Sequence, residues 1–105
     1  MNVWKPEGVE LEPSIEITAW KIYEVKDDCT RHLIGRAGGS GRVSSAIKEY
    51  LKDENVVVTR SGRRYSLIGE SEYDADAAYV WLCWQNINNV TSFTDVSEEY
   101  SNDQV

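Results

Sequence analysis

The sequence predicts an α+β fold, with a small antiparallel sheet of four to five strands packed by one main helix near the C-terminus. Three stretches support this prediction. β-branched and aromatic side chains dominate residues 14–26, as is typical of a strand. Two short apolar runs flank a Ser-Gly pair within residues 56–68, which indicates a hairpin. Residues 74–88 begin with acidic side chains and continue with apolar ones, which indicates a helix.

The length of 105 residues fits a single domain with one core. Both prolines lie in residues 1–13, which we expect to form an extended N-terminal lead-in. The α+β domain is expected over residues 14–97. Residues 98–105 are polar and acidic, so we expect a frayed tail there.

The first strand is expected over residues 14–26. Alternate residues from Ile15 to Ala19 share one face, whereas Trp20 and Ile22 lie on the other face. A change of parity within one strand indicates a bulge, or a strand that is covered on both sides.

A second short strand is expected over residues 31–34, followed by a flexible glycine-rich loop over residues 35–42. Residues 43–51 allow two interpretations. Their apolar side chains follow the i, i+3, i+4, i+7 spacing of an amphipathic helix, and periodicity alone favours a helix. The same residues also fit an irregular strand that leads into the next hairpin.

The Arg-rich segment Arg60–Arg64 is predicted to be a hairpin turn rather than a phosphate site. We expect a two-residue loop, Ser61-Gly62, with Gly62 at a positive φ. This register pairs apolar residues across the strands: Val58 with Tyr65 and Val56 with Leu67. A three-residue loop would place Asn55 opposite Leu67, which is a poorer pairing. The two-residue loop also sets Arg60 against Arg63, and the acidic ends of the chain are the expected source of compensating charge.

The helix is expected over residues 74–88, with Asp74 or Ser71 as its N-cap. It is apolar nearly all round, so more than one side must be covered. The sheet can cover one side. The rest requires a second protein molecule or the C-terminal segment with Val90, Phe93 and Val96.

The net charge of −7 argues against nonspecific binding of nucleic acid. The charge runs in three blocks, −4 over residues 1–30, +5 over 31–69 and −8 over 70–105. We expect these blocks to neutralise one another in the fold. No signal peptide or membrane-length apolar run is apparent, and the two cysteines do not form a disulfide framework, so we expect a cytoplasmic protein with reduced thiols.

Motifs for catalysis or metal binding are weak. Cys29 and His32 are three residues apart along a strand and would point to opposite faces, so they do not suit a catalytic dyad. With Cys83 they lack the paired spacing of a zinc site. The alternating acids from Glu70 to Asp76 lack the glycine and the final glutamate of a calcium loop. The glycine-rich loop matches no phosphate-binding motif. We therefore expect no catalytic residue, no metal and no cofactor.

Three stretches, GRVSSAIKEY, VTRSGRRYSLIGE and DADAAYVWLCW, resemble a group of small uncharacterised bacterial proteins that are often encoded in prophages and other mobile elements. The resemblance covers roughly residues 14–88. It implies a β-rich core in which the Thr-Arg-Ser-Gly turn forms a hairpin and one helix follows. It therefore favours a strand over residues 43–51, and it implies no activity.

The function that the sequence favours is a non-catalytic, acidic protein-binding module. One version is a mobile-element inhibitor, similar to an anti-CRISPR protein, whose carboxylates occupy the basic groove of a host nucleic-acid machine. The alternative is a self-associating domain, a homodimer through the helix; a small enzyme or a nucleic-acid binder would be a further alternative. The expected partner-binding residues are Trp81, Trp84, Glu70, Glu72, Asp74 and Asp76, and the expected basic patch is Arg60, Arg63 and Arg64.

Overall fold

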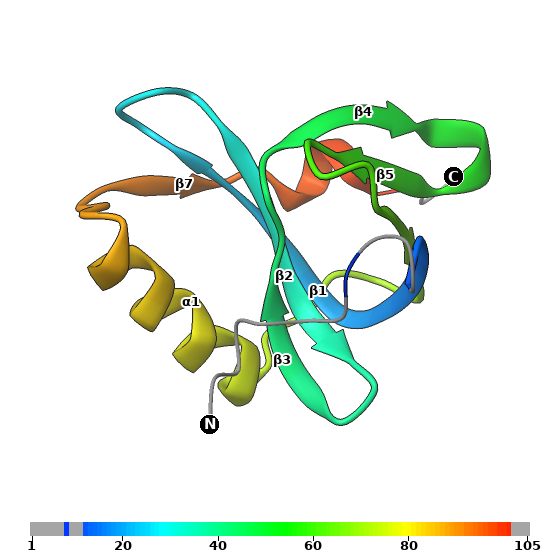
Figure 1. Ribbon diagram of the computed structural model, residues 1–105, viewed down its shortest axis with the longest axis horizontal. Helices are drawn as coiled ribbons and strands as arrows, with labels where there is room; N and C mark the ends of the chain where they lie inside the picture. The colour runs from blue at the N-terminus through cyan, green and yellow to red at the C-terminus, as the bar shows by residue number, and fades with distance from the viewer. Residues whose placement is uncertain (1–7, 9–11, 102–105) are drawn as a thin grey trace.

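The computed structural model describes Gly8 and residues 12–101. Its one main helix lies near the C-terminus, so the predicted α+β class is confirmed. In chain order the elements are β1 (Ser14–Val25), β2 (Arg31–Ala37), β3 (Ser40–Val43), β4 (Ile47–Leu51), the 3-10 turn η1 (Lys52–Glu54), β5 (Val56–Thr59), β6 (Arg64–Leu67), α1 (Ala75–Ile87), β7 (Phe93–Asp95) and the 3-10 turn η2 (Ser97–Tyr100) (Figure 1). Residues 1–7 and 9–11, most of the expected lead-in, and residues 102–105 lie outside the described residues.

The sheet is mixed and larger than predicted. Six strands follow the order β3-β2-β1-β6-β5-β4, and β7 pairs separately with β1. β1 runs parallel to β6, whereas its pairings with β2 and β7 are antiparallel. The expectation of an antiparallel sheet of four to five strands is therefore wrong in both count and direction. That expectation rested on pairing between strands that are neighbours in sequence, whereas the parallel pairing joins strands that are far apart in the chain.

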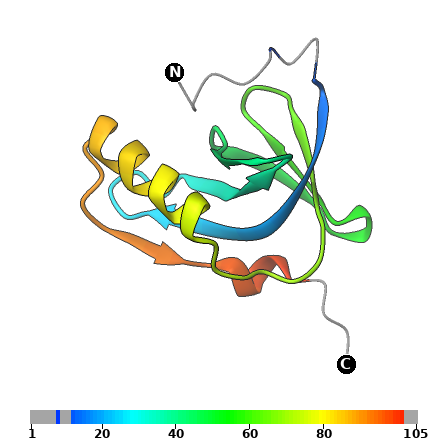
Figure 2. The same ribbon diagram turned by 90° about the horizontal axis from the view of Figure 1, so that it is seen from below.

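The shape of the sheet follows from a bend in β1. Ala19 has a positive φ of 48°, and the register to β2 shifts between Thr18 and Lys21. The parity change in the sequence therefore marks a real bulge. The first four residues of β1 pair with β6. Thr18 and the part after the bulge pair with β2, and the end of the strand also pairs with β7. Figure 2 shows β1 curving strongly between these two groups of strands.

Two regions predicted as loop or helix are strands. The glycine-rich stretch forms the β2–β3 hairpin, with Gly38 at a φ of 66° in its turn. Residues 47–51 form β4, so the helix that periodicity favoured is wrong and the strand implied by the resemblance is correct. A register shift between Ile47 and Glu49 explains the mistake. Because of it, Ile47 and Tyr50 both pack against the core, at the spacing of a helix.

The β5–β6 hairpin has a three-residue loop, not the predicted two-residue one. Val57 pairs with Tyr65, and the Thr59 N–H donates to the Arg63 carbonyl at 3.1 Å. Arg60 therefore lies in the loop and does not face Arg63. Gly62 has the expected positive φ, 93°.

Asn55 explains why this register is stable. The Leu67 N–H donates to the Asn55 carbonyl at 3.0 Å, and the Asn55 side-chain amide donates to the Leu67 carbonyl at 2.8 Å. Asn55 has a left-handed φ of 58°, a conformation that asparagine adopts more readily than most residues. The polar residue that made this register look poor thus pairs with Leu67 through its side chain.

The core has two parts. The larger part lies within the curved sheet and includes Trp20, Leu33 and Val57. Tyr100 of η2 also belongs to it and is buried, so packing extends beyond residue 97, where we expected a frayed tail to begin. The smaller part lies under α1 and is centred on Val25, Ile34 and Trp81. None of the helices within residues 12–101 is long and apolar enough to cross a membrane.

Candidate functional site

Helix α1 begins at a well-defined N-cap. The Asp74 carboxylate accepts a hydrogen bond from the Ala77 N–H at 3.0 Å, as predicted for this residue. This bond and the nearby Arg36 hold the pKa of the Asp74 carboxyl below its ordinary value. The first turn lies directly on β3, because a Cβ added at Gly41 would come within 2.9 Å of the Asp76 carbonyl oxygen. Glycine is therefore required where the helix crosses the sheet.

The inner side of α1 carries Trp81, which is only 3% exposed. Its ring stacks on Trp84 at 5.1 Å between centroids and meets Phe93 edge-on at 5.2 Å. Val90 also packs against this cluster. The C-terminal segment thus covers part of the helix, which is one of the two arrangements that the sequence allowed. Of the two tryptophans predicted to contact a partner, Trp81 is buried in the core and Trp84 is half-buried.

The outer side of α1 exposes three large apolar side chains, beside the polar residues Asp76 and Asn86. Tyr79, Leu82 and Ile87 are 64%, 53% and 63% exposed. Leu82 and Ile87 follow Tyr79 by three and eight positions, which places all three on one side of the helix. We call this surface the outer face. None of the three was among the predicted partner-binding residues, which were tryptophans and acids. The nearly all-round apolar pattern of the helix already indicated that the sheet alone could not cover it.

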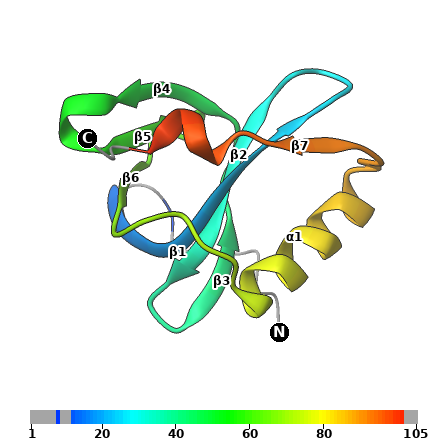
Figure 3. The ribbon, with the colours of Figure 1, turned by 180° about the vertical axis from the view of Figure 1, so that it is seen from behind.

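The predicted acidic residues divide into two pairs. Glu70 and Glu72 are exposed, whereas Asp74 and Asp76 both accept hydrogen bonds from the Arg36 guanidinium, at 3.2 and 2.7 Å. The segment that carries the first pair is fixed against β1, since the Glu72 N–H donates to the Trp20 carbonyl at 3.1 Å. Figure 3 shows this segment crossing the outside of the sheet toward the start of α1.

The predicted basic patch does not form one surface. Arg63 is buried, and its Nε donates to the Glu12 carbonyl at 2.8 Å. Arg64 pairs with Glu54 at 3.1 Å. Arg60 is exposed, and within the described residues its guanidinium makes no hydrogen bond or ion pair.

Ion pairs also connect the basic middle of the chain with both acidic ends. Arg31 reaches Glu24 at 2.7 Å and Glu99 at 2.8 Å. With the Arg36 pairs, these contacts show that the charge blocks partly neutralise one another, as the sequence suggested.

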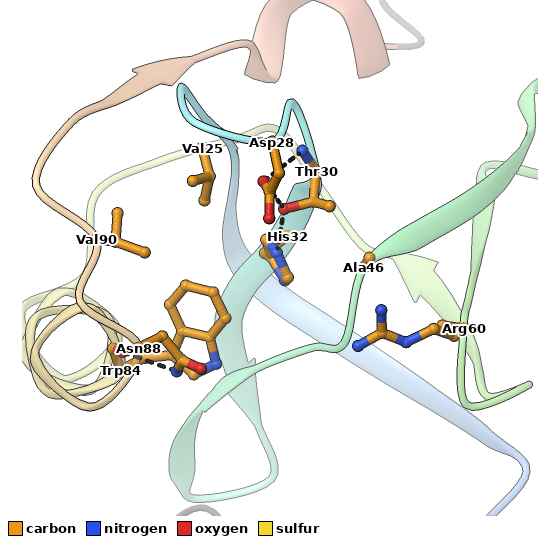
Figure 4. Close-up of a pocket in the computed structure, with 9 residues that line it drawn as sticks. All are labelled: Val25, Asp28, Thr30, His32, Ala46, Arg60, Trp84, Asn88 and Val90. Atoms are coloured by element: carbon orange, nitrogen blue, oxygen red, sulfur yellow. Dashed lines mark hydrogen bonds between the residues drawn. The ribbon is translucent and has the colours of Figure 1, made fainter.

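A cavity of about 190 Å³ lies where the β1–β2 turn, the β5–β6 loop and the C-terminal end of α1 meet (Figure 4). Asp28, His32, Arg60, Trp84 and Asn88 are among its lining residues. The Arg60 guanidinium lies on one side in the close-up, and Trp84 with Asn88 lies on the other.

His32 is held on both ring nitrogens. Its Nδ1 lies 3.0 Å from the Ser44 carbonyl, and its Nε2 lies 3.0 Å from the Thr30 hydroxyl, which donates to Asp28 Oδ1 at 2.8 Å. Because a carbonyl only accepts, Nδ1 carries a proton. Burial lowers the pKa of His32 below its ordinary value.

The cysteines and His32 do not come together as a metal site. Cys29 is exposed in the β1–β2 turn and Cys83 lies half-buried on α1, both as free thiols. In the part of the chain that the structure describes, no three side chains of the His, Cys, Asp or Glu type gather closely enough to hold a metal ion.

Comparisons with known proteins give no relative: no family model, no curated protein and no solved structure matches this chain.

Proposed function

We propose that this protein is a non-catalytic binding module that docks a basic partner protein through the outer face of α1. The observation that carries the proposal is the exposure of Tyr79, Leu82 and Ile87 on one side of a helix whose other side is packed into the core. Single exposed apolar residues are ordinary on a protein surface, but a group on one rigid helix is typical of a helix-in-groove contact.

Charge supports the choice of partner. The helix contains no lysine or arginine, and the nearby Glu70 and Glu72 make no ion pair within the described residues. A partner whose apolar groove has a basic rim would satisfy both surfaces. A host nucleic-acid machine with a basic groove is one partner of this kind, and inhibition of such a machine is the version that we proposed from the sequence.

The same charge weighs against the homodimer. A twofold contact through the outer face would bring together two copies that each carry a net charge of −7. The acidic surface attracts a basic partner, whereas it repels a second copy of this chain. The free thiols of Cys29 and Cys83 fit the cytoplasmic location that we propose for this binding.

The test compares affinity purification with the wild type and three variants. Leu82→Glu places a charge on the outer face, Glu70→Lys with Glu72→Lys reverses the acidic surface, and Tyr73→Ser is the control. Tyr73 is 71% exposed and lies outside the helix. All substituted side chains are exposed, so stability should change by only about 0.5 kcal/mol.

The proposal requires a protein with a basic binding surface that the wild type and Tyr73→Ser retain. Leu82→Glu should lose it, and the charge reversal should retain much less. Equal retention by all four proteins would refute the proposal. Light scattering behind a sizing column, at low and high salt, tests self-association. A salt-resistant dimer that Leu82→Glu dissociates would replace the basic partner with a second copy of the chain.

A further inference from the structure

The cavity beside His32 is separate from the outer face and has no part in the proposed docking. Its walls come from distant parts of the chain: the β1–β2 turn with the start of β2, the β3–β4 connection at Ala46, the β5–β6 loop and the end of α1. Its volume of about 190 Å³ is below the range of roughly 300–1,000 Å³ that holds drug-sized ligands. Any ligand that fits it has only a few non-hydrogen atoms.

One wall is cationic. Arg60 lines the cavity, and its main chain is fixed because its N–H donates to the Ala46 carbonyl at 2.7 Å. Its positive charge also acts on His32 within the cavity, where it contributes to lowering the pKa of the ring. By contrast, Arg31, Arg36 and Arg64 are all bonded to carboxylates. Arg60 is therefore an available anion-binding group, and a guanidinium suits a carboxylate in particular.

Another wall is negative. Asp28 lines the cavity, and hydrogen bonds from the backbone and side chain of Thr30 hold its pKa below the ordinary value, so it is ionised at neutral pH. Both of these bonds go to Oδ1. Helix α1 ends beside the same cavity at Asn88, and the C-terminal end of a helix carries partial negative charge.

Four apolar residues also line the cavity, namely Val25, Val90, Ala46 and Trp84. His32 also lines the cavity, but both of its ring nitrogens already have partners, so it positions the wall and does not itself bind a ligand.

From this arrangement we propose that the cavity binds a small aliphatic zwitterion, an ammonium carboxylate of the amino-acid type. The carboxylate pairs with Arg60. The ammonium group lies toward Asp28 and the C-terminal end of α1, and the short carbon chain packs on the valines and the indole. A simple anion would leave the negative wall unpaired, and a simple amine would leave Arg60 unpaired.

The experiment is a titration of the whole chain, followed by NMR at the Trp84 indole N–H and the Ala46 amide. The probes are glycine, β-alanine, 4-aminobutyrate and 5-aminopentanoate, which differ only in the distance between the two charges. Propionate and propylamine each supply one charge alone. The variants are Arg60→Gln and Asp28→Asn, with the matched controls Arg64→Gln on the same hairpin and Asp27→Asn in the same turn.

We expect one length of zwitterion to shift both signals and to bind more tightly than either single-charge probe. Arg60→Gln and Asp28→Asn should each weaken this binding roughly tenfold or more, because each removes a charged hydrogen-bond partner. The controls should bind as the wild type does. Three results would each overturn the proposal: no shift with any zwitterion at millimolar concentration, propionate binding as tightly as the best zwitterion, or unchanged affinity in Arg60→Gln.

Discussion

Substitution of Gly41 by alanine should displace helix α1 and destabilise the fold. The added Cβ would lie 2.9 Å from both the Asp76 carbonyl oxygen and a Val80 methyl carbon. Ordinary contact begins near 3.4 Å, so the helix would have to move about 0.5 Å, and overpacking of this kind typically costs about 1–3 kcal/mol. The first turn resists the shift because Asp74 caps it and Arg36 holds Asp76.

The matched control is Gly39→Ala in the turn of the same hairpin, where an added Cβ meets nothing within 4 Å. A tolerated Gly→Ala change stabilises by about 0.4–1 kcal/mol through the unfolded state. Urea unfolding followed by tryptophan fluorescence measures the difference. With a slope of about 1–3 kcal/mol/M for a small domain, the midpoint of Gly41→Ala should fall by roughly 1 M relative to the control.

Free energies of unfolding within about 0.5 kcal/mol of each other in the two variants, the ordinary range for surface substitutions, would contradict this prediction. That result would mean that α1 lies farther from β3 than the structure places it. Since the outer face is carried on this helix, a displaced α1 should also weaken partner binding in Gly41→Ala, whereas Gly39→Ala should bind normally.

Three further predictions concern single side chains. His32 has a lowered pKa in the folded protein, so near and below about pH 6.5 the unfolded chain binds more protons than the native one. The free energy of unfolding should therefore be highest above that pH and should fall as the pH drops toward the native pKa. Urea unfolding from pH 7.5 to 5 and NMR titration of the ring measure this change. Asp74→Ala should lose about 0.5–2 kcal/mol with its cap, whereas Asp74→Asn should lose less because asparagine also caps, and equal losses would contradict this. Tyr100→Ala should cost about 3–5 kcal/mol in thermal or urea unfolding, and a loss below 1 kcal/mol would mean that η2 does not pack as described.

Local signals in the sequence predicted helix α1 well. The Asp74 cap, the acidic first turn and the apolar run that follows all lie within a few residues of one another. The signal for the bulge in β1 is also local, because the parity change around Ala19 can be seen in consecutive residues.

Pairing between distant segments could not be predicted in this way. The parallel contact of β1 with β6 has no signature in either strand. The hairpin register depended on Asn55, whose side-chain bond to Leu67 outweighs the apolar pairing on which the prediction relied. In β4, an irregularity in the strand lets Ile47 and Tyr50 both pack against the core at the spacing of a helix. The apolar pattern therefore fitted both a helix and a strand.

The candidate sites show the same limit. The arginines of the hairpin are equivalent in sequence, yet Arg63 is buried, Arg64 is paired and Arg60 faces a cavity. Which of them stays available depends on partners such as Glu12, 51 positions away from Arg63. Likewise, the choice between a buried Trp81 and an exposed Leu82 follows from the direction in which the helix docks.

The central place of β1 has a consequence for how the chain is made. Ser14 pairs with Arg64 and Tyr23 with Asp95, so this strand is synthesised long before two of its partners exist. At 5–20 residues per second, the first half of β1 waits roughly 3–10 s for β6, and the second half waits longer for β7. During that time an apolar strand edge is open to other nascent chains, so the amount of protein that folds should depend strongly on translation speed and on chaperones.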